Sequence, residues 1–293
     1  MKALALFTLC LFGLAANADE VRRVVDASPN GLVKIINTAG NIEVSGWSRD
    51  SVEVVAELGK NVEELIVERD DDEVIVKVKL PKRQKHDRGS SSDLVINVPQ
   101  RSMLKIASVS ADISVNDVLG AQKVQSVSGD IEIIAFAADI DAESVSGDVV
   151  IAGDGSRLRT RATAVSGDVE LSDLGGDVEA GTVTGDLTIV SGSFDRVEMN
   201  TTNGDMVFKG ALQDAGRLEI ETVNGDVDID FADKPSARFD IETFNGDIDN
   251  CFGPDDERVN RYGPGRQLIF TEGSGEGRVV IRTLNGDLRM CVD

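Results

Sequence analysis

One short phrase recurs through the sequence from Ser108 onward and dictates what the chain can fold into. It reads SVSGDI at 126–131, SVSGDV at 144–149, TVTGDL at 182–187, TVNGDV at 222–227, TFNGDI at 243–248 and TLNGDL at 283–288, with variant copies at 108–113, 164–169 and 201–206. Its aspartates are Asp112, Asp130, Asp148, Asp168, Asp186, Asp205, Asp226, Asp247 and Asp287, so the steps are 18, 18, 20, 18, 19, 21, 21 and 40 residues. A period near twenty residues indicates a stacked repeat.

Hydrophobic alternation surrounds each repeat aspartate. Counted from the Asp, positions −8 and −6 are mostly apolar, as in Ile140 and Ala142, and so are +1 and +3, as in Ile131 and Ile133. The residues between them are frequently charged. A period of two on both sides of Gly-Asp indicates two half-buried strands per repeat, joined by a tight turn. The fold class predicted is all-β.

Two β architectures fit this alternation. Asn-Gly between strands is a hairpin signal and would give an antiparallel β meander, whereas a chain that winds onward gives a parallel β-solenoid (β-helix). Position −3 is apolar in most copies: Val127, Val145, Val165, Val183, Val223, Phe244 and Leu284, with Thr202 the exception. In a hairpin these side chains would share the charged face, but at a solenoid corner they can turn inward and join the core. This favours the solenoid, with about 18–21 residues per coil and glycine supplying the corner's unusual φ.

The chain before the regular repeat also reads as β structure. Strands are expected at Leu32–Asn37, Ile42–Ser45, Val52–Leu58, Leu65–Arg69, Val74–Leu80 and Asp93–Val98. Residues 19–107 are therefore predicted to form an N-terminal β region and cap, because the end coil of a solenoid would otherwise expose core and backbone. Residues 108–293 form the repeat β-solenoid, and the loop-like stretch 252–277 is an excursion that explains the 40-residue step.

Residues 1–18 have the features of an export signal. Lys2 precedes the apolar run Ala3–Ala15, and Ala16-Asn17-Ala18 is an A-x-A cleavage site. The run is too short to span a bilayer comfortably, and no later segment is apolar enough to do so. We therefore expect the protein to be exported to the periplasm or cell surface.

The sequence is strongly acidic. Its net charge is −22, and it becomes −23 when residues 1–18, which hold Lys2 and no acid, are removed. Such a surface repels nucleic acid and anionic lipid headgroups and favours divalent cations or basic partners. Acid also keeps a long β protein soluble and discourages edge-to-edge pairing, which accounts for much of the charge without any ligand.

Two cysteines remain after the signal is removed. Cys251 and Cys291 each lie four residues after a repeat aspartate. Equivalent positions in neighbouring coils are about 4.8 Å apart, which is inside the Cα separation that a disulfide needs. The spacing predicts a Cys251–Cys291 disulfide. Two free thiols or a metal pair are the alternatives.

Exported chains with serial S-V-S-G-D and T-x-N-G-D phrases, ending in a Gly263-Pro264-Gly265 segment followed by T-x-N-G-D, resemble the bacterial "putative adhesin" repeat family of unknown function. The resemblance covers most of the chain after the signal. It implies a β-solenoid exported to the envelope. It carries over no binding residues.

The aspartate series is the first candidate site. Stacked in register, the carboxylates would face like charges at about 4.8 Å, costing on the order of 1 kcal/mol per pair even in water. The favoured explanation is structural: each carboxylate caps its own turn through backbone N–H groups and the Ser, Thr or Asn two residues earlier. Calcium bridging between coils is the alternative, although the nonapeptide of calcium-binding β-rolls is absent. No metal site is predicted.

Two sets of basic residues interrupt the acidic pattern. Lys82–Arg88 contains His86, the only histidine, and reads as a solvated loop or as a contact site for an anionic glycan or for the acidic face of another molecule. Arg157, Arg159 and Arg161 alternate along one strand, where they would pair with acids on the next coil or bind an anionic sugar. A single histidine removes most histidine-based catalysis and metal binding.

The sequence favours a non-enzymatic scaffold or interaction protein, binding an unknown protein or glycan of the cell envelope. A glycan-active enzyme, lyase or hydrolase, on a β-helix is the alternative, because paired carboxylates serve glycosidases. However, carboxylates are too abundant here to discriminate, and one Trp, one Tyr and ten Phe offer few sugar platforms. No nucleophile motif, phosphate loop or cofactor fingerprint appears. No catalytic residue and no cofactor are therefore predicted.

Overall fold

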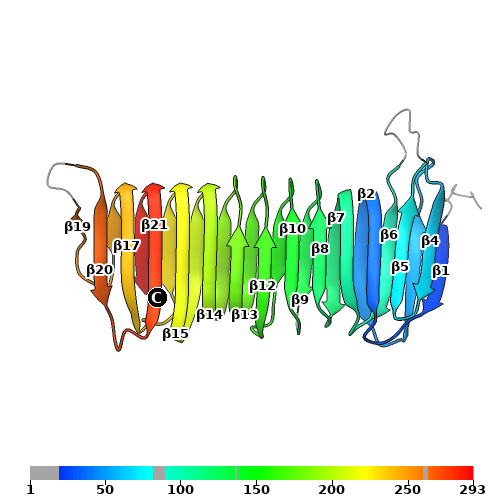
Figure 1. The fold of residues 1–293 in the computed structure, drawn as a ribbon, viewed down its shortest axis with the longest axis horizontal. Coiled ribbons are helices and arrows are strands. Elements are labelled where there is room, and N and C mark those ends of the chain that lie inside the picture. Colours follow the sequence, from blue (N-terminus) through cyan, green and yellow to red (C-terminus); the bar gives the residue numbers. More distant parts are fainter. Residues whose placement is uncertain (1–19, 82–89, 136, 260–262, 293) are drawn as a thin grey trace, which may run out of the picture.

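A computed structural model describes residues 20–81, 90–135, 137–259 and 263–292. The described chain is all-β and forms an elongated, solenoid-like stack of layers (Figure 1). Its strands are β1 (Glu20–Asp26), β2 (Leu32–Trp47), β3 (Ser51–Glu57), β4 (Glu64–Asp70), β5 (Glu73–Lys79), β6 (Asp93–Pro99), β7 (Met103–Val118), β8 (Gln122–Ser126), β9 (Ile131–Ala135), β10 (Ile140–Ser144), β11 (Val149–Ala152), β12 (Arg157–Thr163), β13 (Val169–Gly181), β14 (Leu187–Asn203), β15 (Met206–Asn224), β16 (Val227–Phe231), β17 (Ala237–Asn245), β18 (Ile248–Asn250), β19 (Glu257–Arg258), β20 (Arg266–Thr271), β21 (Gly277–Asn285) and β22 (Leu288–Val292). The signal peptide predicted at residues 1–18 lies outside the described residues.

In the middle of the stack each repeat contributes one strand to each of two faces, on either side of its Gly-Asp turn. On one face β8 and β10 pair in parallel, with Ser126 opposite Ser144. On the other face β9 and β11 pair in parallel, with Ile131 opposite Val149. Consecutive repeat phrases are therefore stacked in register, and the antiparallel meander is not the arrangement of these layers.

The two ends of the stack pair differently from its middle, so the sheet as a whole is mixed. At the N-terminal end β1 pairs antiparallel with β3, β3 with β6, and β4 with β5. At the C-terminal end β20 pairs antiparallel with β17, and β19 with β20. Antiparallel strands at both ends cover layers that would otherwise present an open parallel edge.

Two layers lie out of chain order. The early strand β2 pairs in parallel with β5 and β6 on one side and with β7 on the other. The last strands are also internal: β21 lies between β15 and β17 (Figure 1), and β22 pairs with β16 on one side and β18 on the other. The stacking thus begins at β2, before the regular phrase at Ser108. The chain's final residues fill a layer that the preceding repeats leave open.

The interior is filled by the apolar positions that flank each turn. Ile131 and Ile133 are fully buried, and so are their counterparts in most layers; the exception is Asn250, which is only partly buried in the Asp247 layer. Toward the C-terminal end the core becomes aromatic, with ring centroids 5.7 Å apart for Phe194 and Phe208 and 5.9 Å apart for Phe208 and Phe231. Removing such side chains from water is worth about 1.5–3 kcal/mol each, so this core is the main source of stability.

The repeat glycines are required where neighbouring layers approach most closely. A Cβ on Gly225 would collide with the carbonyl oxygen of Gly204 in the adjacent layer, and a Cβ on Gly204 with that of Gly185. These glycines also have φ of 153° and 155°, values that side-chain-bearing residues rarely adopt. Glycine here permits contact between backbones as well as the turn.

We expect Gly225→Ala to lower the free energy of unfolding by about 1–3 kcal/mol, because the methyl group must push two layers apart. Gly181→Ala is the matched control, since its Cβ would meet no atom closer than 3.7 Å and should change stability by less than about 0.5 kcal/mol. Urea denaturation of both variants gives the comparison. Equal stability of the two would contradict the close-approach explanation.

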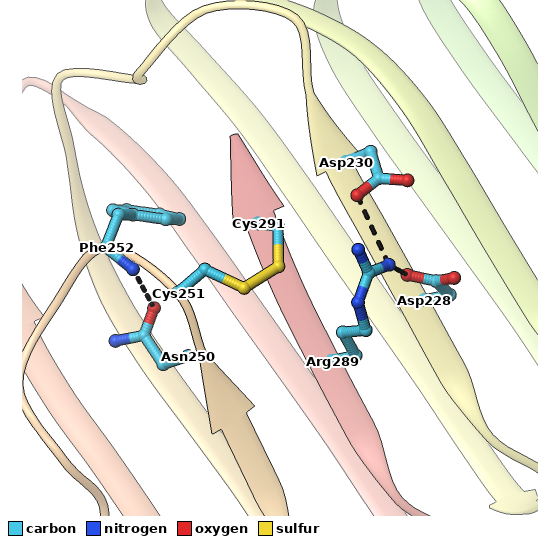
Figure 2. Close-up of a disulfide and its surroundings, with 7 residues drawn as sticks. All are labelled: Asp228, Asp230, Asn250, Cys251, Phe252, Arg289 and Cys291. Atoms are coloured by element: carbon cyan, nitrogen blue, oxygen red, sulfur yellow. Dashed lines mark hydrogen bonds and ion pairs between the residues drawn. A yellow bond between two sulfur atoms is a disulfide. The ribbon is translucent and has the colours of Figure 1, made fainter. Parts of the chain in front are cut away.

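The structure contains the disulfide between Cys251 and Cys291 (Figure 2). Their Cα atoms are 4.9 Å apart, because Cys251 follows β18 directly and Cys291 lies in the neighbouring strand β22. Beside it Arg289 forms ion pairs with Asp228 at 2.6 Å and Asp230 at 3.3 Å, and the hydrogen bond to Asp228 raises the pKa of Arg289. Covalent and ionic contacts therefore fix the inserted layer on both sides.

Replacing both cysteines by serine should lower the free energy of unfolding by about 4 kcal/mol, the chain-entropy value for a loop of this length. Dithiothreitol should destabilise the unmodified protein by a similar amount and leave the serine variant unchanged. The measurement is chemical denaturation under oxidising and reducing conditions. Insensitivity of the unmodified protein to the reductant would argue against the disulfide.

Candidate interaction surface

The repeat aspartates form a continuous hydrogen-bonded series along one corner of the stack. The carboxylate Oδ1 of each accepts a hydrogen bond from the backbone N–H of the aspartate in the next layer, at 2.8–3.1 Å. In spatial order the series is Asp112, Asp130, Asp148, Asp168, Asp186, Asp205, Asp226, Asp287 and Asp247, which we call the Asp ladder. The inserted layer takes its place between Asp226 and Asp247.

The bond that offsets like-charge repulsion thus runs between layers, and the prediction that each carboxylate caps its own turn is wrong for these hydrogen bonds. Bonds from N–H groups to a carboxylate are stronger than neutral ones. At the outer end, the carboxylate of Asp247 instead pairs with Arg266 at 2.7 Å. Hydrogen bonding to Asp256, together with the charge of Asp247, raises the pKa of Arg266.

Asp168→Asn and Asp168→Ala separate the two effects of this carboxylate. Asparagine keeps an oxygen for the N–H of Asp186 and removes a charge, so we expect stability equal to or above that of the unmodified protein. Alanine removes the acceptor and should cost about 0.5–1.5 kcal/mol relative to asparagine. Urea denaturation measures both. Equal stability of the two variants would show that the interlayer hydrogen bond contributes nothing.

Several polar groups beneath the turn are also bonded between layers, although the buried hydroxyls of Ser126, Thr222 and Thr283 have no hydrogen-bond partner among the described residues. The hydroxyl of Thr182 donates to the carbonyl of Gly167 at 3.0 Å, and that of Thr243 to the carbonyl of Gly286 at 3.1 Å. In the later layers the amides of Asn203, Asn224, Asn285 and Asn245 form a second series, at 2.7–2.9 Å. The corner is consequently rigid, because each turn is bonded to both neighbours.

The side chains at position −3 point outward, so the prediction that they join the core is wrong. Position −4, a buried Ser or Thr in most layers, takes the inward place, and alternation along the strand turns the next residue to solvent. The outward side chains are between 39% and 51% exposed. They are Val109, Val127, Val145, Val165, Val183, Val223, Leu284 and Phe244, which we call the corner row; Thr202 takes the same position in one layer.

Two grooves follow the corner row. A groove of about 680 Å³ lies beside Val223, Leu284 and Phe244, with a second wall from residues 264–267 of the C-terminal excursion. A groove of about 460 Å³ lies beside Val127, Val145 and Val165. Contiguous exposed apolar surface of this kind marks interaction sites on soluble proteins, so the corner row and its grooves are the candidate functional site.

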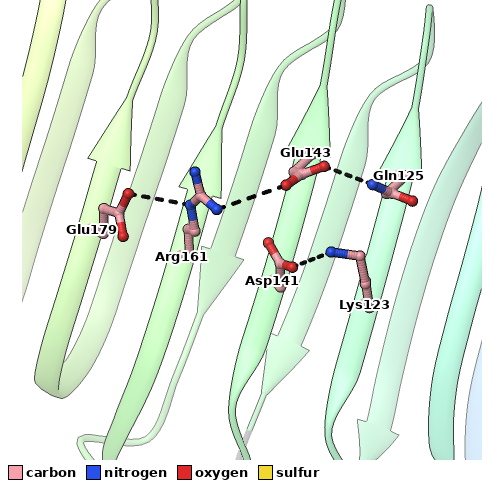
Figure 3. A network of polar contacts seen from close by, with 6 residues as sticks. All are labelled: Lys123, Gln125, Asp141, Glu143, Arg161 and Glu179. Carbon is pink, nitrogen blue, oxygen red and sulfur yellow. Dashed lines mark hydrogen bonds and ion pairs between the residues drawn. The ribbon is translucent and has the colours of Figure 1, made fainter.

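The adjacent outward face carries charges that largely pair with one another (Figure 3). Arg161 lies 3.2 Å from Glu179 and 3.9 Å from Glu143, and Gln125 donates to Glu143 at 2.7 Å. Lys123 pairs with Asp141, and this hydrogen bond raises the pKa of Lys123. Exposed pairs of this kind contribute about 0–1 kcal/mol each. The face has the character of a solvated surface.

The structure places the three arginines of β12 differently from one another. Arg157 pairs with Asp195, and Arg161 with the two glutamates of its neighbouring layers. Arg159 has no ion pair among the described residues, although its backbone N–H donates to Asp139 at 3.2 Å. The basic cluster at 82–88 lies outside the described residues.

Across the corner itself the charge is of one sign. No lysine or arginine occurs between position −4 and the aspartate in any repeat. Within the described chain, Asp247 alone among the ladder carboxylates has a basic partner. In the same residues no group of three or more His, Cys, Asp and Glu is arranged to hold a metal ion. The described chain contains no helix with the length and apolar composition of a membrane span.

Comparison with protein families gives two tandem matches to the family described as Toastrack DUF4097, at residues 34–182 and 177–290. The chain belongs to the Toastrack family. Although the family matches twice, the layers of this Toastrack protein run through the overlap without a break, because β13 pairs with β14 along both faces. Among curated proteins no match was found.

Comparison with solved structures gives matches that cover almost all of this Toastrack chain. They include a "putative cell adhesion protein" from Clostridium sporogenes (11% identity, 94% of this chain and 100% of that chain, TM-score 0.23). They also include a "putative lipid binding protein" from Parabacteroides distasonis (9%, 93% and 97%, TM-score 0.30) and a "putative adhesin" from Parabacteroides merdae (11%, 94% and 97%, TM-score 0.29). Similarities this low assign no function.

Proposed function

We propose that this Toastrack protein is a non-enzymatic, exported interaction protein of the adhesin type, which contacts a partner in the cell envelope or at the cell surface. Under this proposal the chain is a parallel β-solenoid with capped ends, residues 1–18 direct export to the periplasm or cell surface, and the corner row is the contact surface. The protein performs no chemistry of its own.

One observation carries the proposal: exposed apolar side chains occur at the same position in nearly every layer of the Asp ladder. A single exposed valine is ordinary on a protein surface. A row that repeats through the stack is different, because nearly every layer has an apolar side chain at a position that the alternation of the strand exposes to solvent. The interlayer bonds of the corner hold this row rigid, so a partner meets a preorganised surface and little entropy is lost on binding.

The carboxylates nearest the larger groove support binding more than catalysis. Glu242 accepts a hydrogen bond from Gln267 at 2.7 Å, and Glu221 lies 3.8 Å from Arg282. Both carboxylates are thus engaged with neighbouring side chains. No observation specifically favours the glycan-active alternative.

The experiment is photo-crosslinking in the cells that produce the protein. A photoreactive phenylalanine analogue replaces Val165 of the corner row, and in a matched control it replaces Val150, which is also exposed but lies on the other face. We expect a discrete adduct from position 165 and none from position 150. Adducts absent from both, or equal at both, would remove the corner row as the contact surface.

A further inference from the structure

We infer that the corner row is a docking surface for a cationic amphipathic α-helix of a partner protein. This inference rests on the proposed function and specifies the chemistry of the partner. The row is uninterrupted through five consecutive layers, with Val109, Val127, Val145, Val165 and Val183, and the last four of these carry the full Gly-Asp turn. Thr202 separates them from Val223 in the next layers.

Charge determines which partners can approach. The row runs parallel to the Asp ladder, three residues away along each turn, with only Ser, Thr, Asn, Gly or Ala between them. Asp130, Asp148, Asp168 and Asp186 have no basic partner in the described part of the chain, and each uses Oδ1 for the next layer's N–H. The second carboxylate oxygen of each remains for a cation. A partner must therefore combine an apolar strip with a parallel line of positive charge.

The spacing of the layers favours an α-helix as the element of the partner that carries the apolar strip and the line of positive charge. Neighbouring layers are about 4.8 Å apart, and an α-helix rises about 5.4 Å per turn. Over four layers the mismatch accumulates to about 2 Å, less than half a turn. A helix lying along the stack can thus place one apolar side chain against each layer, with Lys or Arg on the flank facing the ladder.

Other occupants fit less well. An extended strand presents side chains on one face about 6.7 Å apart, and falls out of step after one or two layers. A second copy of this chain would bring its own Asp ladder to the same edge and be repelled. Anionic lipid and nucleic acid are repelled for the same reason. A glycan would find one aromatic ring, Phe244, in the whole row.

The test uses the purified, oxidised protein and three synthetic 18-residue peptides. One is made of leucine and lysine with leucines at helical i, i+3, i+4 spacing, one has the same composition scrambled, and one has glutamate in place of lysine. Binding is measured by isothermal titration, and helix formation by circular dichroism. We expect the patterned cationic peptide to bind and become helical, to bind about tenfold or more tightly than the scrambled one, and to weaken between low and high salt.

Two quadruple variants assign the contacts. Val127, Val145, Val165 and Val183 are changed to Thr, the residue that already occupies this position at Thr202; Asp130, Asp148, Asp168 and Asp186 are changed to Asn, which retains an acceptor for the interlayer bonds. Each should weaken binding about tenfold or more. The control is Val95→Thr with Val150→Thr, exposed valines away from the corner, which should leave binding unchanged. Melting temperatures verify that all variants are folded.

The outcomes separate this inference from the proposed function. Three results would contradict the helix inference. They are equal binding of the patterned and scrambled peptides, binding of the acidic peptide, and undiminished binding of the patterned peptide by either quadruple variant. If no peptide binds but the crosslinker at position 165 captures a partner, the helix inference falls and the contact surface stands. If no peptide binds and no adduct forms at position 165, both the helix inference and the proposed contact surface are wrong.

Discussion

Everything in this structure depends on how closely one layer approaches the next at the Gly-Asp turn. Glycine removes the Cβ that would hold the backbones apart, and the aspartate of each layer then accepts the N–H of its neighbour. Because the same contact repeats from Asp112 to Asp247, the stack behaves as a one-dimensional array in which each layer stabilises only its neighbours. The rigidity of the corner, and so the exposure of the corner row, follows from it.

Much of this architecture was predictable from the sequence. The period of the phrase fixes the layers, and alternation identifies core residues such as Ile131 and Ile133. The registered spacing of Cys251 and Cys291 places them on adjacent layers, where the disulfide lies. These features are local, or repeat with a fixed period, so a linear pattern is sufficient to find them.

The remaining features depend on relations that a linear pattern does not encode. The sequence predicts Val165 and its equivalents to be buried, because an apolar side chain is a more obvious core residue than the hydroxyl at position −4. The hydroxyl of Thr182, which donates to the carbonyl of Gly167 in the preceding layer, shows how a polar residue is accommodated inside that layer. The acceptor role of the aspartates belongs to two layers at once. The order of the last layers is a matter of topology, since β21 pairs in parallel with both β15 and β17.

The internal position of the final layer affects how such a chain can be completed. Strands β17 and β18 cannot reach their final neighbours until residues 277–292 arrive between them and the earlier layers. Before then, β17 and β18 would be able to pair directly with β15 and β16, because their turn sequence closely matches that of β21 and β22. In that arrangement they would occupy the position of the inserted layer, with Cys251 beside Asp230. In the native order, the disulfide between Cys251 and Cys291 ties the inserted layer to the layer outside it. Deletion of the C-terminal strands β21 and β22 would therefore remove a layer from inside the stack and not from its end.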